Sequence, residues 1–198
     1  MGSIVVFENV SLDGVIEDPT GEEGFSPYDW RADLTPAERR NWDTLLLDDA
    51  QAAHVLLLGR RTYEFFAARY PQRAGALADK INSLPKYVVS ATLTDPGWDN
   101  STVLPGTDTV TEVSKLKDTV NGEIGVYASS QLVHTLLEHD LVDELRLIIF
   151  PLVMGAGNRL FDDSSNRKPT RPTPLHLVDA RSLGERLAYL TYRRISTD

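Results

Sequence analysis

The residues that follow a short apolar segment near position 58 are suited to binding an anion. The segment 54–58 is predicted to be a buried strand, and a helix is predicted to begin shortly after it. Between them lie Gly59, Arg60, Arg61 and Thr62. Free N–H groups and the dipole at a helix N-terminus attract anions, and an arginine can pair with two phosphate oxygens. The pattern indicates a phosphate-binding turn. The alternative is an ordinary strand-to-helix turn with solvated arginines.

Two other predicted strand ends carry small or hydroxyl side chains. Ser90, Ala91 and Thr92 follow one strand, and Ala128, Ser129, Ser130, Gln131 and Leu132 follow the strand that ends at Tyr127. Small side chains allow a ligand to lie against the backbone, and open α/β sheets bind ligands at the carboxyl ends of their strands. The alternative is that Ser129 or Ser130 only caps the next helix. Three such strand ends together favour a ligand-binding edge.

Two carboxylates bracket the long polar loop of residues 14–31. Asp13 precedes this loop and Asp33 follows it, just before a predicted helix. Long loops within a compact domain are often functional. Burial can keep a carboxylic acid neutral near pH 7, so either aspartate is a candidate proton donor. Simple turn aspartates are the alternative.

The elements that position these residues alternate between strand and helix. Residues 4–7 are apolar and β-branched, which is typical of a strand buried on both faces. Thr35, Pro36 and Glu38 form the capping-box pattern that begins a helix. Strand-like segments at 144–150, 175–179 and 187–195 have no helix between them. The prediction is therefore a single α/β domain over residues 1–198, with a mostly parallel central sheet flanked by helices and antiparallel C-terminal strands.

Composition excludes several classes of function. The net charge of −9 argues against binding a nucleic-acid backbone, which requires a basic face. The chain has no cysteine, so disulfides and thiolate metal sites are absent. The four histidines lack the spacing of metal ligands, and no metal is predicted. No signal peptide or membrane-spanning apolar segment is visible, so we expect a soluble, cytoplasmic protein.

Taken in order, these segments resemble the dihydrofolate-reductase-like superfamily. Within it, they are similar to the C-terminal reductase domain of the bifunctional riboflavin-biosynthesis deaminase-reductase. The motifs are Ser11-Leu12-Asp13-Gly14, the segment 58–64, the segment 124–137, Leu141-Val142-Asp143-Glu144-Leu145 and Pro151-Leu152-Val153-Met154-Gly155. The resemblance spans nearly the whole chain. It implies the fold described above and NADPH as the cofactor.

The resemblance also implies roles for individual residues. The segment 59–62 matches the part of the family that holds the NADPH diphosphate and 2′-phosphate, and 90–92 matches a wall of the adenosine site. The segment 128–132 matches the turn over the diphosphate, where the family has a glycine pair and this chain has Ala128-Ser129. Asn9, Ile16 and Tyr127 match positions at the nicotinamide pocket. Asp33 lies in a segment like the one that carries the folate-binding carboxylate.

The expected function is hydride transfer from NADPH to a small heterocyclic or sugar-amine substrate. The nearest named reaction is the reduction of 5-amino-6-(5-phosphoribosylamino)uracil in riboflavin biosynthesis. Asp13, or alternatively Asp33, is expected to position the substrate or supply a proton. The alternatives are a dihydrofolate reductase that uses Asp33, and a non-catalytic nucleotide-binding sensor on the same fold. By analogy with the riboflavin-pathway reductases, we expect a homodimer formed through the C-terminal strands.

Overall fold

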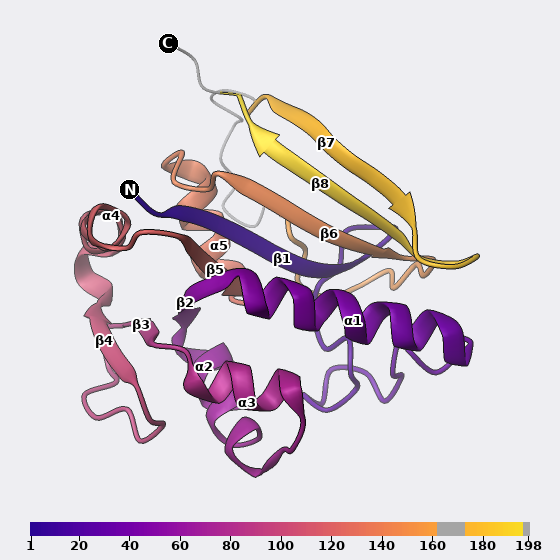
Figure 1. The fold of residues 1–198 in the computed structure, drawn as a ribbon, viewed down its shortest axis with the longest axis horizontal. Coiled ribbons are helices and arrows are strands. Elements are labelled where there is room, and N and C mark those ends of the chain that lie inside the picture. The colour runs from indigo at the N-terminus through magenta and orange to yellow at the C-terminus, as the bar shows by residue number, and fades with distance from the viewer. Residues whose placement is uncertain (162–172, 196–198) are drawn as a thin grey trace. The chain divides into compact units, whose positions relative to one another are not determined.

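The computed structural model describes residues 1–161 and 173–195, which fall into two compact units (Figure 1). The first unit contains residues 1–7 and 44–143, and the second contains residues 8–43 and 144–198. Strand β1 (Ser3–Ser11) and helix α1 (Pro36–Ala52) each contribute residues to both units. The polar, proline-rich segment 158–174 lies mostly outside the described residues.

The first unit is built on parallel strands. Strands β2 (Ala53–Gly59), β3 (Lys86–Ser90), β4 (Ser101–Pro105) and β5 (Glu123–Tyr127) join β1 in the order β4-β3-β2-β5-β1. Every pairing between these neighbours is parallel, so their carboxyl ends lie at the same edge. This arrangement places the turns after β2, β3 and β5 beside one another.

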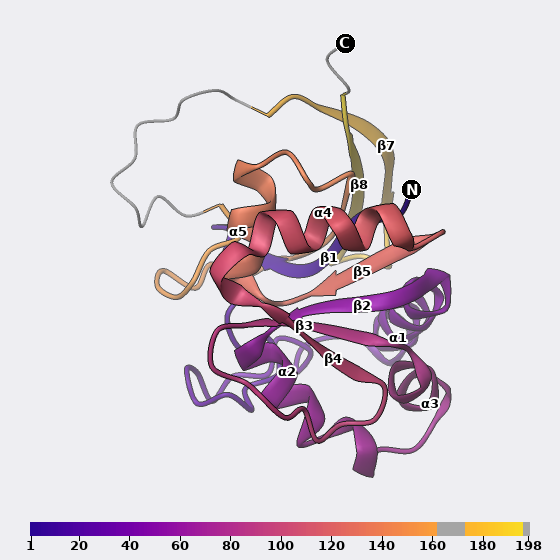
Figure 2. The same ribbon diagram turned by 90° about the vertical axis from the view of Figure 1, so that its left-hand side faces the viewer.

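Helices cover both faces of these strands. They are α2 (Arg60–Ala67), α3 (Ala76–Ser83), α4 (Thr109–Thr119) and α5 (Ser130–Glu138), with short 3-10 turns η1 (Tyr70–Gln72) and η2 (Gly106–Asp108). Figure 2 shows α2 and α3 on the opposite side of the strands from α4. Leu56 and Leu58 of β2 pack in one apolar cluster with Tyr63 and Ile81, while Leu57, which is also fully buried, points to the other face. Burial on both faces explains why β2 has no polar alternation.

The second unit completes the sheet with antiparallel strands. Strands β6 (Glu144–Phe150), β7 (Leu175–Ser182) and β8 (Ala188–Arg194) extend it in the order β1-β6-β8-β7, and both β6–β8 and β7–β8 are antiparallel. The eight strands therefore form a mostly parallel sheet with antiparallel C-terminal strands, and the predicted fold class is confirmed. Strand β7 lies at the edge of this sheet, and most of its residues are exposed.

The predicted capping box forms and also holds a distant turn. The backbone N–H of Thr35 donates to Oε2 of Glu38 at 2.9 Å, and the N–H of Glu38 donates to Oγ1 of Thr35 at 3.2 Å. The other carboxylate oxygen, Oε1, accepts from the N–H groups of Glu185 and Arg186 at 3.0 Å each. Glycine is required in this turn because a Cβ atom on Gly184 would lie 2.4 Å from Cγ of Glu38. The box thus joins the start of α1 to the β7–β8 turn.

Two boundaries differ from the sequence-based expectation. Strand β1 continues past Phe7 to Ser11, so Glu8 and Asn9 lie within it. Helix α2 begins at Arg60, directly after β2 and earlier than expected, so both arginines lie in its first turn. Among the helices of residues 1–161 and 173–195, none is long and apolar enough to cross a membrane.

Candidate functional site

The first unit brings together the three turns that were singled out in the sequence. Strands β3, β2 and β5 are parallel neighbours, and Gly59 at the end of β2 pairs in register with Val89 near the end of β3. The segments 59–62, 90–92 and 128–132 therefore start from adjacent strand ends at one edge. This is where ligands of open α/β sheets bind.

The turn after β5 has an unusual backbone. Ala128 and Ser129 have φ angles of 48° and 60°, so two consecutive residues with side chains adopt the left-handed conformation. Such a residue costs about 1–3 kcal/mol and persists only where its surroundings enforce the conformation, mainly at functional sites. The position where the family has its glycine pair thus keeps a glycine-like backbone although this chain has Ala and Ser there.

A hydrogen-bond network around Ser129 enforces this turn. Its hydroxyl accepts from the backbone N–H of Gly59 at 3.0 Å and donates to the carbonyl of Tyr127 at 3.0 Å. Its own N–H donates to Oγ1 of Thr62 at 3.0 Å. Ser129 precedes α5 but makes no side-chain capping bond to that helix, so its hydroxyl links β5 to β2 instead of acting as a cap. Sequence reasoning did not identify this link.

The residues at this edge have the chemistry of an anion site. Neither α2 nor α5 has a side-chain hydrogen bond at its N-cap, so no capping side chain competes for the N–H groups of the first turns. Arg60 and Arg61 are both exposed in the first turn of α2. Nη1 of Arg60 lies 3.0 Å from Oε1 of Glu64, one helical turn further on. Two cationic side chains beside two uncapped helix ends fit a ligand with several phosphate groups.

The turn after β3 is shaped by Ser90. Its hydroxyl accepts from the N–H groups of Thr92 and Leu93 at 3.1 and 2.9 Å. A Cβ atom on Gly106, at the end of β4, would lie 2.7 Å from the backbone nitrogen of Ala91. Glycine at 106 therefore allows the two strand ends to approach closely. The side chain of Ser90 organises the turn, and the backbone of 90–92 forms its surface.

Tyr127 is fixed at the end of β5 by a residue that sequence reasoning missed. Its hydroxyl donates to Oδ2 of Asp49, a nearly buried carboxylate of α1, at 2.5 Å. Its ring contacts Phe7 with centroids 5.9 Å apart. This anchoring holds the residue immediately before the left-handed turn.

In the second unit, the two residues matched to the nicotinamide pocket have defined partners. Oδ1 of Asn9 accepts from the indole Nε1 of Trp42 on α1 at 2.8 Å. The side chain of Ile16 is buried, and its backbone N–H donates to the carbonyl of Asn158 at 2.9 Å. The sequence alone did not indicate that Trp42 orients Asn9.

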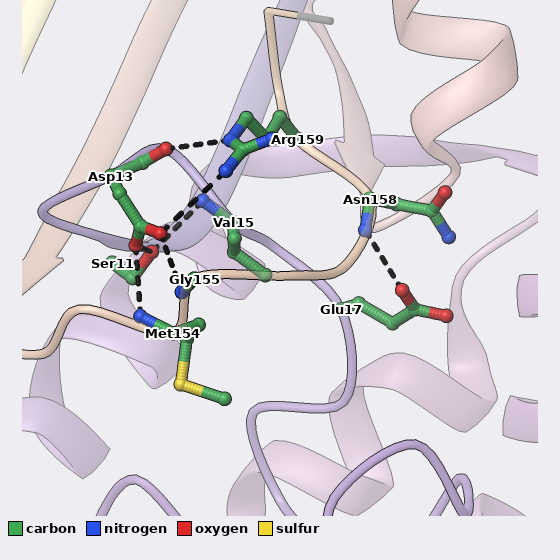
Figure 3. A network of polar contacts seen from close by, with 8 residues as sticks. All are labelled: Ser11, Asp13, Val15, Glu17, Met154, Gly155, Asn158 and Arg159. Carbon is green, nitrogen blue, oxygen red and sulfur yellow. Dashed lines mark hydrogen bonds and ion pairs between the residues drawn. The ribbon is translucent and has the colours of Figure 1, made fainter. Parts of the chain in front are cut away.

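Asp13 anchors a loop (Figure 3). Its carboxylate accepts from the Ser11 hydroxyl at 2.7 Å and from the N–H groups of Met154 and Gly155 at 3.0 and 2.8 Å. Nε of Arg159 donates to the Asp13 carbonyl at 3.0 Å. The bond from Ser11, followed by those from the two backbone groups, lowers the pKa of Asp13 to about 2. The carboxylate is therefore ionised at neutral pH, which suits a positioning role better than proton donation.

Asp33 is exposed and accepts a hydrogen bond from the Tyr28 hydroxyl. This bond is the largest of the effects that raise the pKa of Tyr28. The burial that made Asp33 a candidate proton donor is absent, because the residue is exposed.

The second unit instead buries a different carboxyl, that of Glu8. Glu8 is 4 % exposed, and its Oε1 atom has no hydrogen-bond partner. Burial, with a smaller contribution from the charge of Glu23, raises the pKa of Glu8 well above its ordinary value. An acid within the apolar run from Ile4 to Val10 was the available sequence signal. It was missed because the strand was expected to end at Phe7.

A mostly parallel sheet flanked by helices and extended by antiparallel C-terminal strands defines a dihydrofolate-reductase-like α/β protein. The RibD C-terminal domain family matches residues 3–189. The chain belongs to this family.

Relatives and solved structures resemble this chain over most of its length. YyaP of Bacillus subtilis (strain 168), an uncharacterised protein, is 29% identical over 188 residues, which cover 92% of this chain and 90% of YyaP. The crystal structure of a candidate riboflavin biosynthesis protein from Shewanella sp. PV-4 has a TM-score of 0.70 at 22% identity, with 98% and 99% of the two chains covered. Dihydrofolate reductase of Enterococcus faecalis, in complex with NADP(H), has a TM-score of 0.56 at 17% identity and covers 98% of each chain. At these identities, the solved structures establish the fold.

Proposed function

We propose that this protein is an NADPH-dependent reductase that transfers hydride to a small heterocyclic or sugar-amine substrate. The nearest named reaction is the reduction of 5-amino-6-(5-phosphoribosylamino)uracil. Membership in the RibD C-terminal domain family supports the reaction class. The observation that carries the proposal is the left-handed Ala128-Ser129 turn, held against Gly59 beside two uncapped helix ends.

The residues of the first unit fit the phosphate groups of such a cofactor. Arg60 and Arg61 supply positive charge for a 2′-phosphate, and the first turns of α2 and α5 offer N–H groups to a diphosphate. Ser90, Ala91 and Thr92 supply an adjacent strand end for the adenosine part. NADPH, when bound, supplies the hydride, and the protein supplies binding and orientation.

We assign the binding of the substrate and of the nicotinamide ring of NADPH to residues of the second unit. In this proposal Asn9, oriented by Trp42, and the buried Ile16 line the nicotinamide pocket. Asp13 holds residues 154–155 against the end of β1 as an ionised carboxylate, so its role is to position this loop. Reduction also requires a proton, and Glu8 is the buried carboxyl of this unit whose raised pKa favours holding one.

The proposal is tested by following NADPH oxidation with a panel of pterins, pyrimidines and small carbonyl compounds. We expect turnover with a nitrogen heterocycle or sugar-amine and none with simple carbonyl compounds. Turnover of dihydrofolate alone would instead identify a dihydrofolate reductase. Tight NADPH binding without turnover on any compound would contradict catalysis and indicate a nucleotide sensor.

A further inference from the structure

Asn121 and Gly122 lie in the first unit, between the end of α4 and the start of β5. Asn121 is the only asparagine of the chain that is followed by glycine. The amide carbon of an asparagine side chain lies within reach of the next backbone nitrogen, and glycine has no side chain that hinders the approach. Asparagine is one of the thermolabile residues of proteins. The pair therefore has the residue types for a reaction between a side chain and the backbone.

The fold holds neither of the two reacting groups. The side chain of Asn121 is exposed, and within residues 1–161 and 173–195 its amide has no hydrogen-bond partner. The N–H of Gly122 also has no partner in the described part of the chain, although the carbonyl of Gly122 accepts from the N–H of Ser3 at 3.1 Å. The amide of Asn121 can therefore rotate until its carbon meets the Gly122 nitrogen.

The other asparagines of the described residues are held or hindered. The amide oxygens of Asn9 and Asn82 each accept from the indole N–H of a tryptophan, at 2.8 and 3.0 Å. The amide of Asn100 donates to a backbone carbonyl at 3.4 Å. Asn41 is exposed but lies inside α1, where the N–H of the next residue belongs to the helical hydrogen bonds. Asn158 is followed by a bulky arginine.

Asp13 and Gly14 are the one pair of the chain in which an aspartate precedes glycine, and they allow a direct comparison. The N–H of Gly14 donates to the carbonyl of Ser11 at 3.0 Å, so its nitrogen is engaged. The bonds that the Asp13 carboxylate accepts from the Ser11 hydroxyl and from two backbone N–H groups lower its pKa to about 2. An ionised carboxylate is a much weaker electrophile than an amide, because it carries a negative charge. The fold protects this pair, whereas Asn121 and Gly122 have no such protection.

We propose that Asn121 is a site of spontaneous deamidation and backbone isomerisation in the folded protein. The Gly122 nitrogen attacks the amide carbon of the Asn121 side chain and forms a C–N bond with it. The amide nitrogen leaves as ammonia and takes the proton of the Gly122 nitrogen. Water then opens the resulting five-membered imide at one of its two carbonyls. One opening gives aspartate, and the other gives isoaspartate, in which the main chain runs through the former side chain.

Isoaspartate changes the turn that precedes β5. It adds one methylene group to the main chain directly before Gly122, whose carbonyl is bonded to Ser3 of β1. The ring of His54 in β2 covers Gly122 so closely that a Cβ atom on this glycine would lie 2.4 Å from Nδ1. The N–H of Glu123 donates to the same Nδ1 atom at 3.3 Å. These contacts join β5 to β1 and β2, so a shift of Gly122 should destabilise the first unit.

The test follows the folded full chain during incubation at mildly alkaline pH. Trypsin cleaves after Lys117 and Arg146, so residues 118–146 form a peptide in which Asn121 is the only asparagine. Mass spectrometry should show conversion of an amide to a carboxyl in this peptide, with two products of equal mass that chromatography separates. The peptide of residues 1–31, which contains Asp13, should remain a single species.

Two variants and one solvent condition make this test specific. Asn121→Gln keeps an amide but would have to form a six-membered ring, so its conversion should be at least roughly tenfold slower, a barrier higher by about 1.4 kcal/mol. The matched control Asn41→Gln removes an exposed asparagine from α1 and should leave conversion of residues 118–146 unchanged. Conversion that occurs only in urea-unfolded protein would show that the fold protects Asn121, and it would overturn the inference. Equal conversion in Asn121→Gln and the unmodified protein would also overturn it.

A second measurement tests the effect on stability. Both products carry a negative charge that the amide lacks, so anion exchange separates them from the unmodified protein. The isoaspartate form should unfold at a lower urea concentration, and Asn121→Asp, which adds the charge without the methylene group, should lie between it and the unmodified protein. Equal urea midpoints for the isoaspartate form and the unmodified protein would overturn the proposed effect on the turn.

These outcomes do not depend on whether the protein is a reductase. Asn121 and Gly122 precede β5, whereas the segment 128–132, which is proposed to bind the cofactor, follows this strand.

Discussion

The hydroxyl of Ser129 accepts a hydrogen bond from the backbone N–H of Gly59 at 3.0 Å, although the two residues are 70 positions apart in the sequence. The bond joins the ends of β5 and β2. It also accompanies a backbone conformation at Ser129 that residues with side chains rarely adopt.

Two substitutions at Ser129 distinguish the contribution of its hydrogen bond to stability from the cost of its left-handed backbone conformation. Ser129→Ala leaves the Gly59 N–H without this partner and keeps the left-handed residue, so the free energy of unfolding should fall by about 1–3 kcal/mol. Ser129→Gly loses the same bond but adopts a positive φ without steric cost, so its loss should be smaller. Urea unfolding of both variants provides the measurement. A glycine variant less stable than the alanine variant would show that the turn is not strained.

Arg60 and Arg61 should determine the preference for NADPH over NADH. Arg60→Ala is expected to weaken NADPH binding by roughly 10- to 150-fold, the value of one charge-assisted hydrogen bond, and to leave NADH almost unchanged. Arg61→Ala should have the same effect or a smaller one. Glu64→Gln is a matched control, because it releases Arg60 from its ion pair and should not weaken NADPH.

Fluorescence titration of both cofactors against each arginine variant measures these affinities. Equal losses for NADPH and NADH would show that the arginines hold the shared diphosphate. No loss for either cofactor would show that both side chains are solvated surface charges.

Asp13 should stabilise the protein through the bonds that lower its pKa. The pKa of about 2 lies below the ordinary value of 3.8, so the contribution is fully present above that ordinary value and is lost as the pH falls through about 2. Asp13→Asn should therefore lower the melting temperature at pH 6, and the difference from the unmodified protein should shrink towards pH 2. Thermal unfolding across this range provides the measurement.

The same variant also tests a direct role of Asp13 in the reaction. If Asp13 acts on the substrate, Asp13→Asn should reduce turnover at least a hundredfold with NADPH affinity and melting temperature unchanged. A lower melting temperature with turnover largely retained is the result expected for a loop anchor.

The contribution of Glu8 to the stability of the protein should change with pH in the opposite direction to that of Asp13. Its raised pKa means that the folded protein retains a proton that the unfolded chain releases, so the stability associated with Glu8 declines as the pH rises from the ordinary value of 4.5 through the raised pKa. Relative to the unmodified protein, Glu8→Met should gain stability over this interval. The measurement is the midpoint of urea unfolding of Glu8→Met and of the unmodified protein at several pH values from 4 to 8. A constant difference would mean that Glu8 does not titrate in this range.

The edge strand β7 should form the contact of a homodimer. An exposed edge strand presents unpaired N–H and C=O groups that a second copy can pair with, and Leu177 and Val178 on β7 are 47% and 44% exposed. Light scattering at micromolar concentration should give twice the mass of one chain, and Leu177→Lys should reduce it to one. A single-chain mass for the unmodified protein would refute the dimer.

Local features of this protein could be predicted from the sequence, because the residues that interact are close in the chain. The capping box of Thr35 and Glu38 is of this kind, as is the termination of β2 at Gly59. The absence of helices between the last three strands indicated their antiparallel arrangement. The expected cofactor and the residues expected to bind it follow from the family resemblance, and the structure places the three predicted turns at adjacent strand ends.

The remaining features depend on pairs of residues that lie far apart in the sequence, and no sequence pattern indicates that they interact. Asp13 is held by backbone N–H groups 141 and 142 residues away, and every residue except proline has such a group, so no residue type marks the partner. The link from Ser129 to Gly59 is hidden for the same reason. Asp49 lies in α1, 78 positions before Tyr127, and only the folded structure shows that the Tyr127 hydroxyl reaches it.

The carboxylate of Glu38 has a consequence for the order in which the chain folds during synthesis. Its bonds to Thr35 can form as soon as the first helix emerges, but its other oxygen is matched to N–H groups 147 and 148 residues later. At translation rates of roughly 5–20 residues per second, that interval lasts about 7–30 seconds. During this interval, Oε1 of Glu38 at the beginning of α1 is hydrogen-bonded to water, because the N–H groups of Glu185 and Arg186 have not yet been made. The β7–β8 hairpin therefore completes an element that was made well before it.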